Sequence, residues 1–154
     1  IYNLRPTKLI LAGQKTLFYP EIQKIIKKLP HGVTKYIKFI FNFPQKQLKS
    51  LIDSCDILVL PSQQESFGLV LIEAWARGKP VIVSNIPALT QLVTQTQGGL
   101  IFETQNVSDL SQKIYQLIKN PKDRHQLGQN GLNYVKNNYT WPIVGTKICQ
   151  KISL

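Results

Sequence analysis

The sequence predicts an α/β protein, a Rossmann-like parallel sheet with helices on both faces. Short segments that are apolar throughout alternate with segments whose apolar residues recur at helical spacing. Strands of this wholly apolar kind are typical of parallel sheets that helices cover on both sides. A chain of 154 residues has the length of one domain with a sizeable core. We therefore interpret residues 1–154 as a single domain.

The apolar segments give the expected strands in order. They lie at residues 8–13, 35–41, 56–61, 81–84 and 100–102. Amphipathic helices are expected at residues 20–30, 44–55, 69–78 and 89–96, and another carries apolar residues from 110 to 118. Pro30 and Gly78 are the stop signals of two of them. Residues 122–152 look helical, and we expect a C-terminal helix at 141–154.

Parallel strands place their carboxyl ends at one edge of the sheet, and ligands of such folds bind there. We place at this edge Gly13, Phe43, residues 61–68, residues 84–89 and residues 98–99. The segment ESFGLVLIE at 65–73 belongs to it. Its first glutamate should lie in the loop and its second on the helix, about two turns along.

This segment combines groups that suit a nucleotide sugar. The N-terminus of a helix offers N–H groups and a positive dipole end to a phosphate, and Gly68 allows close approach to the backbone. Carboxylates such as Glu65 and Glu73 accept hydrogen bonds from the hydroxyls of a sugar or a ribose. Two glutamates at this spacing also arise by chance. In that case Glu65 is an ordinary loop residue and Glu73 lies on the solvent-exposed face of a helix.

The wider context is more specific. Residues 61–84, PSQQESFGLVLIEAWARGKPVIVS, resemble the donor-site signature of retaining glycosyltransferase family 4, the group 1 glycosyltransferases of GT-B fold. The segments before and after it are similar to the same family, so the resemblance covers essentially the whole chain. The matching positions of the signature are Pro61, Ser62, Glu65, Phe67, Gly68, Glu73, Ala74, Ala76, Gly78, Pro80, Val81 and Ser84.

The resemblance implies that this is the C-terminal, donor-binding half of a GT-B fold. Glu65 would then act at the anomeric centre of the donor sugar as the catalytic residue, and Glu73 would bind the ribose hydroxyls. The remaining donor-binding residues would be Ser62, Phe67, Gly68, Leu69, Gly13 and Phe43. The donor would be a UDP-, GDP- or ADP-sugar. The resemblance implies no cofactor and no metal, and the sequence shows no carboxylate or histidine cluster with ligand spacing.

Some features depart from the family pattern. Asn42 stands where the family often has glycine, and residues 85–91 lack its Gly-Gly and later glutamate. The basic residues that neutralise the diphosphate in the family belong to an upstream strand–helix unit, and Arg5 does not match them. The N-terminal acceptor-binding domain of the family is also missing, so we expect the isolated chain to be inactive.

Two alternatives stay open, and the net charge of +11 favours the first of them. One is a binder of nucleic acid or of an acidic membrane surface, which no RNA-binding motif or amphipathic anchor supports. The other is a non-catalytic nucleotide-sugar-binding module, favoured by the altered residues 85–91.

No apolar stretch reaches the roughly 20 residues of a membrane span, and no signal peptide is evident. We expect a cytoplasmic protein without a nucleic-acid partner. A peripheral membrane contact of the full-length protein, the parent of this chain, is left open.

Overall fold

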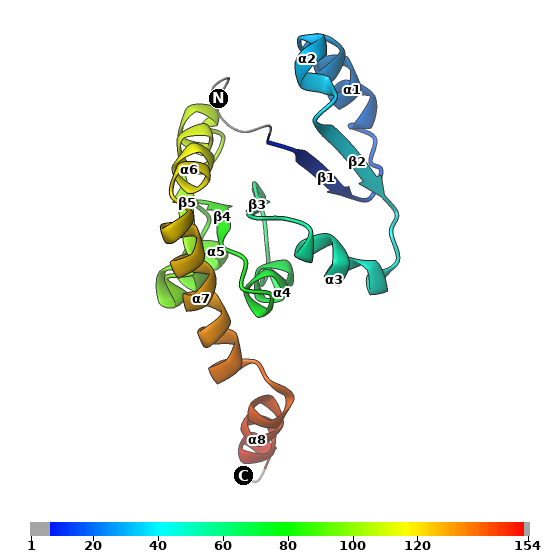
Figure 1. The fold of residues 1–154 in the computed structure, drawn as a ribbon. Helices are drawn as coiled ribbons and strands as arrows, with labels where there is room; N and C mark the ends of the chain where they lie inside the picture. Colours follow the sequence, from blue (N-terminus) through cyan, green and yellow to red (C-terminus); the bar gives the residue numbers. More distant parts are fainter. Residues whose placement is uncertain (1–6, 153–154) are drawn as a thin grey trace. The chain divides into compact units, whose positions relative to one another are not determined.

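The computed structural model describes residues 7–152, and Figure 1 shows the order of their helices and strands. The chain divides into two compact units, one up to Leu48 and one from Lys49 onward. Helix α3 (Gln45–Asp53) crosses the division. Arg5 lies outside the described residues, as do positions 153 and 154 of the expected C-terminal helix.

The first unit is a two-stranded parallel sheet with its connecting helices. Strand β1 (Leu9–Gly13) pairs in register with β2 (Ile37–Phe41), so that Gly13 lies beside Phe41. The crossover contains α1 (Tyr19–Lys27) and the short α2 (His31–Thr34). The Tyr19 ring meets the edges of Phe39 and Phe41, with centroids 5.5 and 5.0 Å away. Helix α1 ends before the predicted stop at Pro30, and α2 was not expected because a single turn has no readable periodicity.

The second unit contains a three-stranded parallel sheet in the order β3 (Leu58–Leu60), β4 (Val81–Ser84) and β5 (Gly99–Phe102). Helices α4 (Leu69–Ala76) and α5 (Pro87–Thr96) make the crossovers. All four residues of β4 are buried, as its apolar run predicted. Strands therefore alternate with helices as expected, although they form two hydrogen-bonded sheets.

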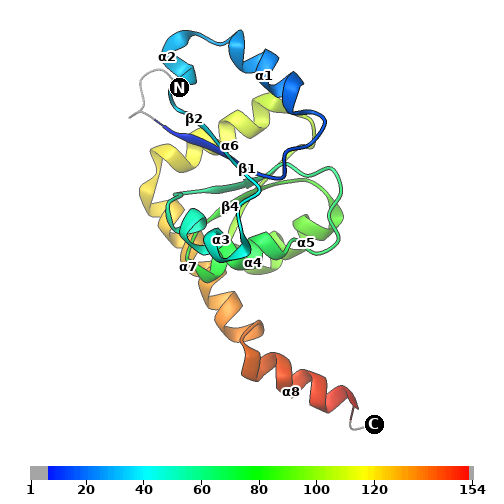
Figure 2. The same cartoon turned by 90° about the vertical axis from the view of Figure 1, so that its right-hand side faces the viewer.

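Helices cover both faces of this sheet. Helix α6 (Val107–Lys119) lies on one side of β4, and α4 and α5 lie on the other (Figure 2). Leu117 of α6 joins Ile82 and Phe102 in one core cluster. Because successive side chains of a strand point to opposite faces, Val81 and Val83 face α4 and α5. The predicted α/β class with parallel strands between helices is confirmed.

Helix α7 (Pro121–Asn138) lies close against α4. A Cβ at Gly131 would come within 2.1 Å of Cδ1 of Trp75, so only glycine allows this approach. The Trp75 Nε1–H donates to the Gly98 carbonyl oxygen over 2.9 Å. Helix α4 ends at Ala76, and Gly78 follows with a φ of +64°, which agrees with the predicted stop. Helix α7 ends at Asn138, and α8 (Trp141–Ile152) begins at residue 141, where the sequence predicted the start of the C-terminal helix.

Candidate functional site

The loop between β3 and α4, residues 61–68, is fastened at its start by the neighbouring strand. Ser84 is fully buried at the end of β4 and donates its hydroxyl hydrogen to the backbone carbonyl oxygen of Ser62. Ser62 itself is half-buried. The bond confirms that the carboxyl ends of β3 and β4 meet at one edge. The sequence matched both serines to the signature but indicated no contact between them.

The same loop ends at Gly68, which the structure buries. Its φ of +77° lies in the left-handed region that favours glycine. A Cβ here would lie 3.0 Å from Cδ2 of Leu89 and 3.8 Å from Cγ of Glu65. Backbone conformation and space therefore both favour glycine at this position. The close approach of a ligand to Gly68 stays a prediction.

Glu65 lies in the middle of this loop, as predicted. Its side chain is half-buried, and Oε1 accepts a hydrogen bond of 3.2 Å from the N–H of Ser66. Its Cγ lies 3.8 Å from where a Cβ at Gly68 would be, so the stem of the side chain is near the start of α4. The loop therefore presents a carboxylate beside the N-terminus of a helix.

Glu73 lies on α4 and is half-buried. It is the fifth residue of the helix, so it stands a little more than one turn from the helix start rather than two. At the start itself Leu69 and Phe67 are 68% and 42% exposed. The two glutamates therefore stand on either side of the beginning of α4, as the sequence predicted.

The loop after β4 is joined to the loop after β5 through Asn85. The Asn85 N–H donates to the carbonyl oxygen of Phe102 (2.8 Å), and its own carbonyl oxygen accepts from Oγ1 of Thr104 (3.2 Å). Thr90 donates to Asn85 Oδ1 over 3.0 Å. Residues 85–91, which depart from the family pattern, are a short turn followed by α5, which begins at Pro87, two residues before the helix expected at 89–96.

The prediction for residues 98–99 was wrong. Gly99 is the first residue of β5 and pairs with Val81, the first residue of β4. In a parallel sheet these positions lie at the amino end of the strands, opposite the candidate site. Gly99 is needed there because a Cβ would come within 2.3 Å of the Val81 carbonyl oxygen.

Gly13 and Phe43 belong to the first unit. Gly13 ends β1, and its carbonyl oxygen accepts from the Asn42 N–H over 3.0 Å. Asn42 adopts a φ of +51°, a region that glycine enters freely and asparagine tolerates. This explains how asparagine replaces the family's glycine here. The assignment of Gly13 and Phe43 to a donor site stays a prediction.

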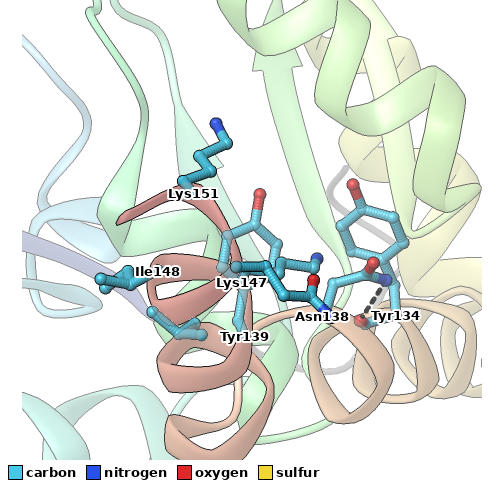
Figure 3. A pocket seen from close by; sticks show the side chains of 8 residues that line it. Tyr134, Asn138, Tyr139, Lys147, Ile148 and Lys151 are labelled. Carbon is cyan, nitrogen blue, oxygen red and sulfur yellow. Dashed lines mark hydrogen bonds between the residues drawn. The ribbon is translucent and has the colours of Figure 1, made fainter. Parts of the chain in front are cut away.

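An open pocket of about 460 Å³ lies between α7 and α8 (Figure 3). None of the predicted site residues lines it. Phe67 nevertheless reaches one of its walls, because its ring meets that of Tyr139 with centroids 6.1 Å apart. Burial, with a contribution from the neighbouring Tyr134, raises the pKa of Tyr139 above its ordinary value. The residues that line the pocket are Tyr134, Asn138, Tyr139, Val144, Lys147, Ile148, Gln150 and Lys151.

Within residues 7–152, no three or more histidine, cysteine, aspartate or glutamate side chains lie together as a metal site would require. In the same part of the chain, no helix is both long and apolar enough to cross a membrane.

Two curated glycosyltransferases illustrate the similarity to known sequences. An uncharacterised glycosyltransferase of Methanocaldococcus jannaschii is 34% identical over 77% of this chain and 34% of its own length. The D-inositol 3-phosphate glycosyltransferase of Corynebacterium efficiens is 29% identical over 76% of this chain and 27% of its own length. The chain thus spans about a third of the length of these relatives.

Solved structures share the fold. Sucrose-phosphate synthase from Thermosynechococcus elongatus superposes with a TM-score of 0.82 and 25% identity, covering 95% of this chain and 38% of that one. HepE of Anabaena, solved with UDP, gives a TM-score of 0.84 at 22% identity, covering 97% and 42%. The family model of the glycosyl transferases group 1 matches residues 2–134. This chain therefore belongs to the group 1 glycosyltransferases.

Proposed function

We propose that this chain is the donor-binding half of a retaining glycosyltransferase. The parent protein would transfer a sugar from a nucleoside diphosphate sugar to an acceptor. The observation that carries the proposal is the position of Glu65 and Glu73 on either side of the start of α4. Because the chain spans about a third of its relatives, the transfer is assigned to the parent, whose remaining part would hold the acceptor. The chain alone should not catalyse it.

The start of α4 suits the diphosphate. The first N–H groups of a helix have no partner within the helix, and the positive end of the helix dipole attracts anions. Here these groups begin at Leu69, which is exposed, directly after the Gly68 turn. A diphosphate bound there would lie between the two glutamates, with its two ends directed towards different carboxylates.

The two carboxylates would then have different roles. Glu73, on the helix, would accept hydrogen bonds from the ribose hydroxyls of the nucleotide. Glu65, in the loop, would lie near the sugar, where positive charge develops on the anomeric carbon during transfer and a carboxylate stabilises it. We expect the reaction to need no metal, so activity should survive a chelator.

The test is a transfer assay of the parent protein with a panel of UDP-, GDP- and ADP-sugars. UDP-glucose is the first donor to try, because HepE was also solved with that compound. Transfer from one donor would support the proposal if NMR of the product shows the same anomeric configuration as in the donor. Inversion would contradict the retaining mechanism. Binding of a nucleotide sugar without transfer would favour a non-catalytic module, and tight duplex binding lost with salt would favour the nucleic-acid alternative.

A further inference from the structure

The segment from Ser84 to Leu89 holds both ends of the loop that carries Glu65. At the first end the Ser84 hydroxyl donates to the carbonyl oxygen of Ser62. At the second end the Gly68 backbone lies on Leu89, whose Cδ2 would be 3.0 Å from a Cβ at that position. Ser84 and Leu89 are both fully buried. Two buried side chains from one segment therefore fix the loop on either side of the carboxylate.

Ser84 is the polar residue of an otherwise apolar strand. β4 reads Val81, Ile82, Val83 and Ser84, and all four residues are fully buried. Burying a hydroxyl costs free energy unless it is hydrogen-bonded. The Ser84 hydroxyl donates not to a neighbouring strand but to the loop carbonyl of Ser62. The strand itself could be completed by an apolar residue such as valine. The hydroxyl of Ser84 therefore contributes to the structure through its hydrogen bond to the loop.

Glu65 stands midway between the two anchors, three residues from each. So short a span leaves its backbone few conformations once Ser62 and Gly68 are fixed. A Cβ added at Gly68 would lie 3.8 Å from Cγ of Glu65, so the stem of the side chain is close to the second anchor. The direction of the carboxylate thus depends on both ends of the loop being held.

We propose that Ser84 is a positioning residue that fixes the Glu65 carboxylate through the backbone of Ser62. The proposal rests on the proposed function for what Glu65 does, whereas the anchoring itself is independent of it. Loss of the hydroxyl would leave the Ser62 carbonyl without this donor and release the first end of the loop. Small displacements of a catalytic group are costly to the rate.

The first experiment compares Ser84→Ala with Thr96→Val in the parent enzyme. Thr96 is a matched control, because it carries the other buried hydroxyl of this region, at the far end of α5 from the loop. Ser84→Ala should lower kcat by about tenfold to a hundredfold while the donor KM stays within roughly threefold. Thr96→Val should leave both constants of the folded enzyme nearly unchanged. Equal kcat losses in the two variants would overturn the positioning role.

A double-mutant cycle shows whether Ser84 acts through Glu65. In a Glu65→Gln background, Ser84→Ala should have almost no further effect on kcat, because the group that it positions is already lost. Additive effects of the two substitutions would overturn the proposal. If Glu65→Gln slows transfer but Ser84→Ala does not, the proposed function stands and the positioning role fails.

Backbone amide order parameters test the anchor without any activity. In Ser84→Ala the order parameters of residues 63–67 should fall from about 0.85 to below about 0.6, and in Thr96→Val they should not. This result would support the anchor even if the parent transferred no sugar, in which case only the proposed function would fail. Unchanged order parameters in Ser84→Ala would show that the bond to Ser62 does not hold the loop.

Discussion

The loop at residues 61–68 and helix α4, which follows it directly, are held in different ways. The helix is fixed by its buried side chains, because Leu71, Ala74 and Trp75 have no exposed surface. In the loop only Gly68 is buried, and its first end is fixed by the hydrogen bond from Ser84. Two adjacent segments of one signature thus depend on different interactions. The helix is held by extensive apolar packing, and the loop by one hydrogen bond at its first end and by the packing of Gly68 on Leu89 at its second.

This difference suggests a separation of stability from chemistry. The packed helix provides a rigid base for Glu73 and for the N–H groups at its start. The loop contributes little buried apolar area, so a change there should affect the reaction more than the stability of the fold. Substitutions in the two segments can therefore test whether the separation is real.

The largest effect on stability is expected from Trp75→Ala, which removes the packing that holds helix α4. The change removes a fully buried indole and its hydrogen bond to Gly98. It should lower the free energy of unfolding by about 3–5 kcal/mol. Urea unfolding followed by circular dichroism measures this. Trp141→Ala is the control, since Trp141 is 87% exposed, and its change should stay within about 0.5 kcal/mol. Similar losses in the two variants would show that α4 is not fixed by packing.

On the loop side, Glu65→Gln should act on the rate. The change keeps the shape of the side chain and removes the charge that would stabilise the anomeric carbon. We expect kcat of the parent enzyme to fall about a hundredfold, with donor affinity within several-fold. Steady-state kinetics decide this, with Glu21→Gln in α1 as the control. A pure KM effect would place Glu65 in ground-state binding instead.

Glu73→Gln should have a smaller effect than Glu65→Gln, and it should weaken the binding of the nucleotide. A carboxylate that accepts from two ribose hydroxyls makes charge-assisted hydrogen bonds, so nucleotide affinity should fall about tenfold. Calorimetric titration of the parent protein with UDP, or with whichever nucleotide it binds, gives this number. An unchanged dissociation constant would remove the ribose role. If Glu73→Gln and Glu65→Gln gave the same kinetic change, the two segments would not differ in function.

Much of this arrangement follows from local sequence signals. The apolar run VIVS predicts the buried strand β4, and Glu65 and Glu73 were correctly expected in a loop and on a helix. These features depend on periodicity and on a glycine between neighbouring segments, which a sequence displays directly. The helix stop at Gly78 belongs to the same class.

What the sequence did not reveal depends on contacts between distant residues. The bond from Ser84 to Ser62 and the ring contact of Phe67 with Tyr139 join segments that only the fold brings together. Asn42 looked like a departure from the family until its positive φ showed why asparagine can stand there.

The smallest effect is expected where α4 ends, at the exposed ion pair of Arg77 with Asp53. The guanidinium donates from Nε and Nη2 to the two carboxylate oxygens, over 2.6 and 2.8 Å. The hydrogen bond from Arg77 lowers the pKa of Asp53 below its ordinary value of 3.8. Stability from this pair is therefore present above pH 3.8 and is lost as the pH falls through the lowered pKa of the folded state. Because both side chains are exposed to solvent, the contribution should be small and screened by salt.

We expect Asp53→Asn to be slightly less stable than the wild type at pH 7, with the difference shrinking below pH 3.8 and in high salt. Unfolding curves of both proteins across this range measure it. A difference that persisted at low pH would mean that the end of α4 depends on the shape of Asp53 rather than on its charge.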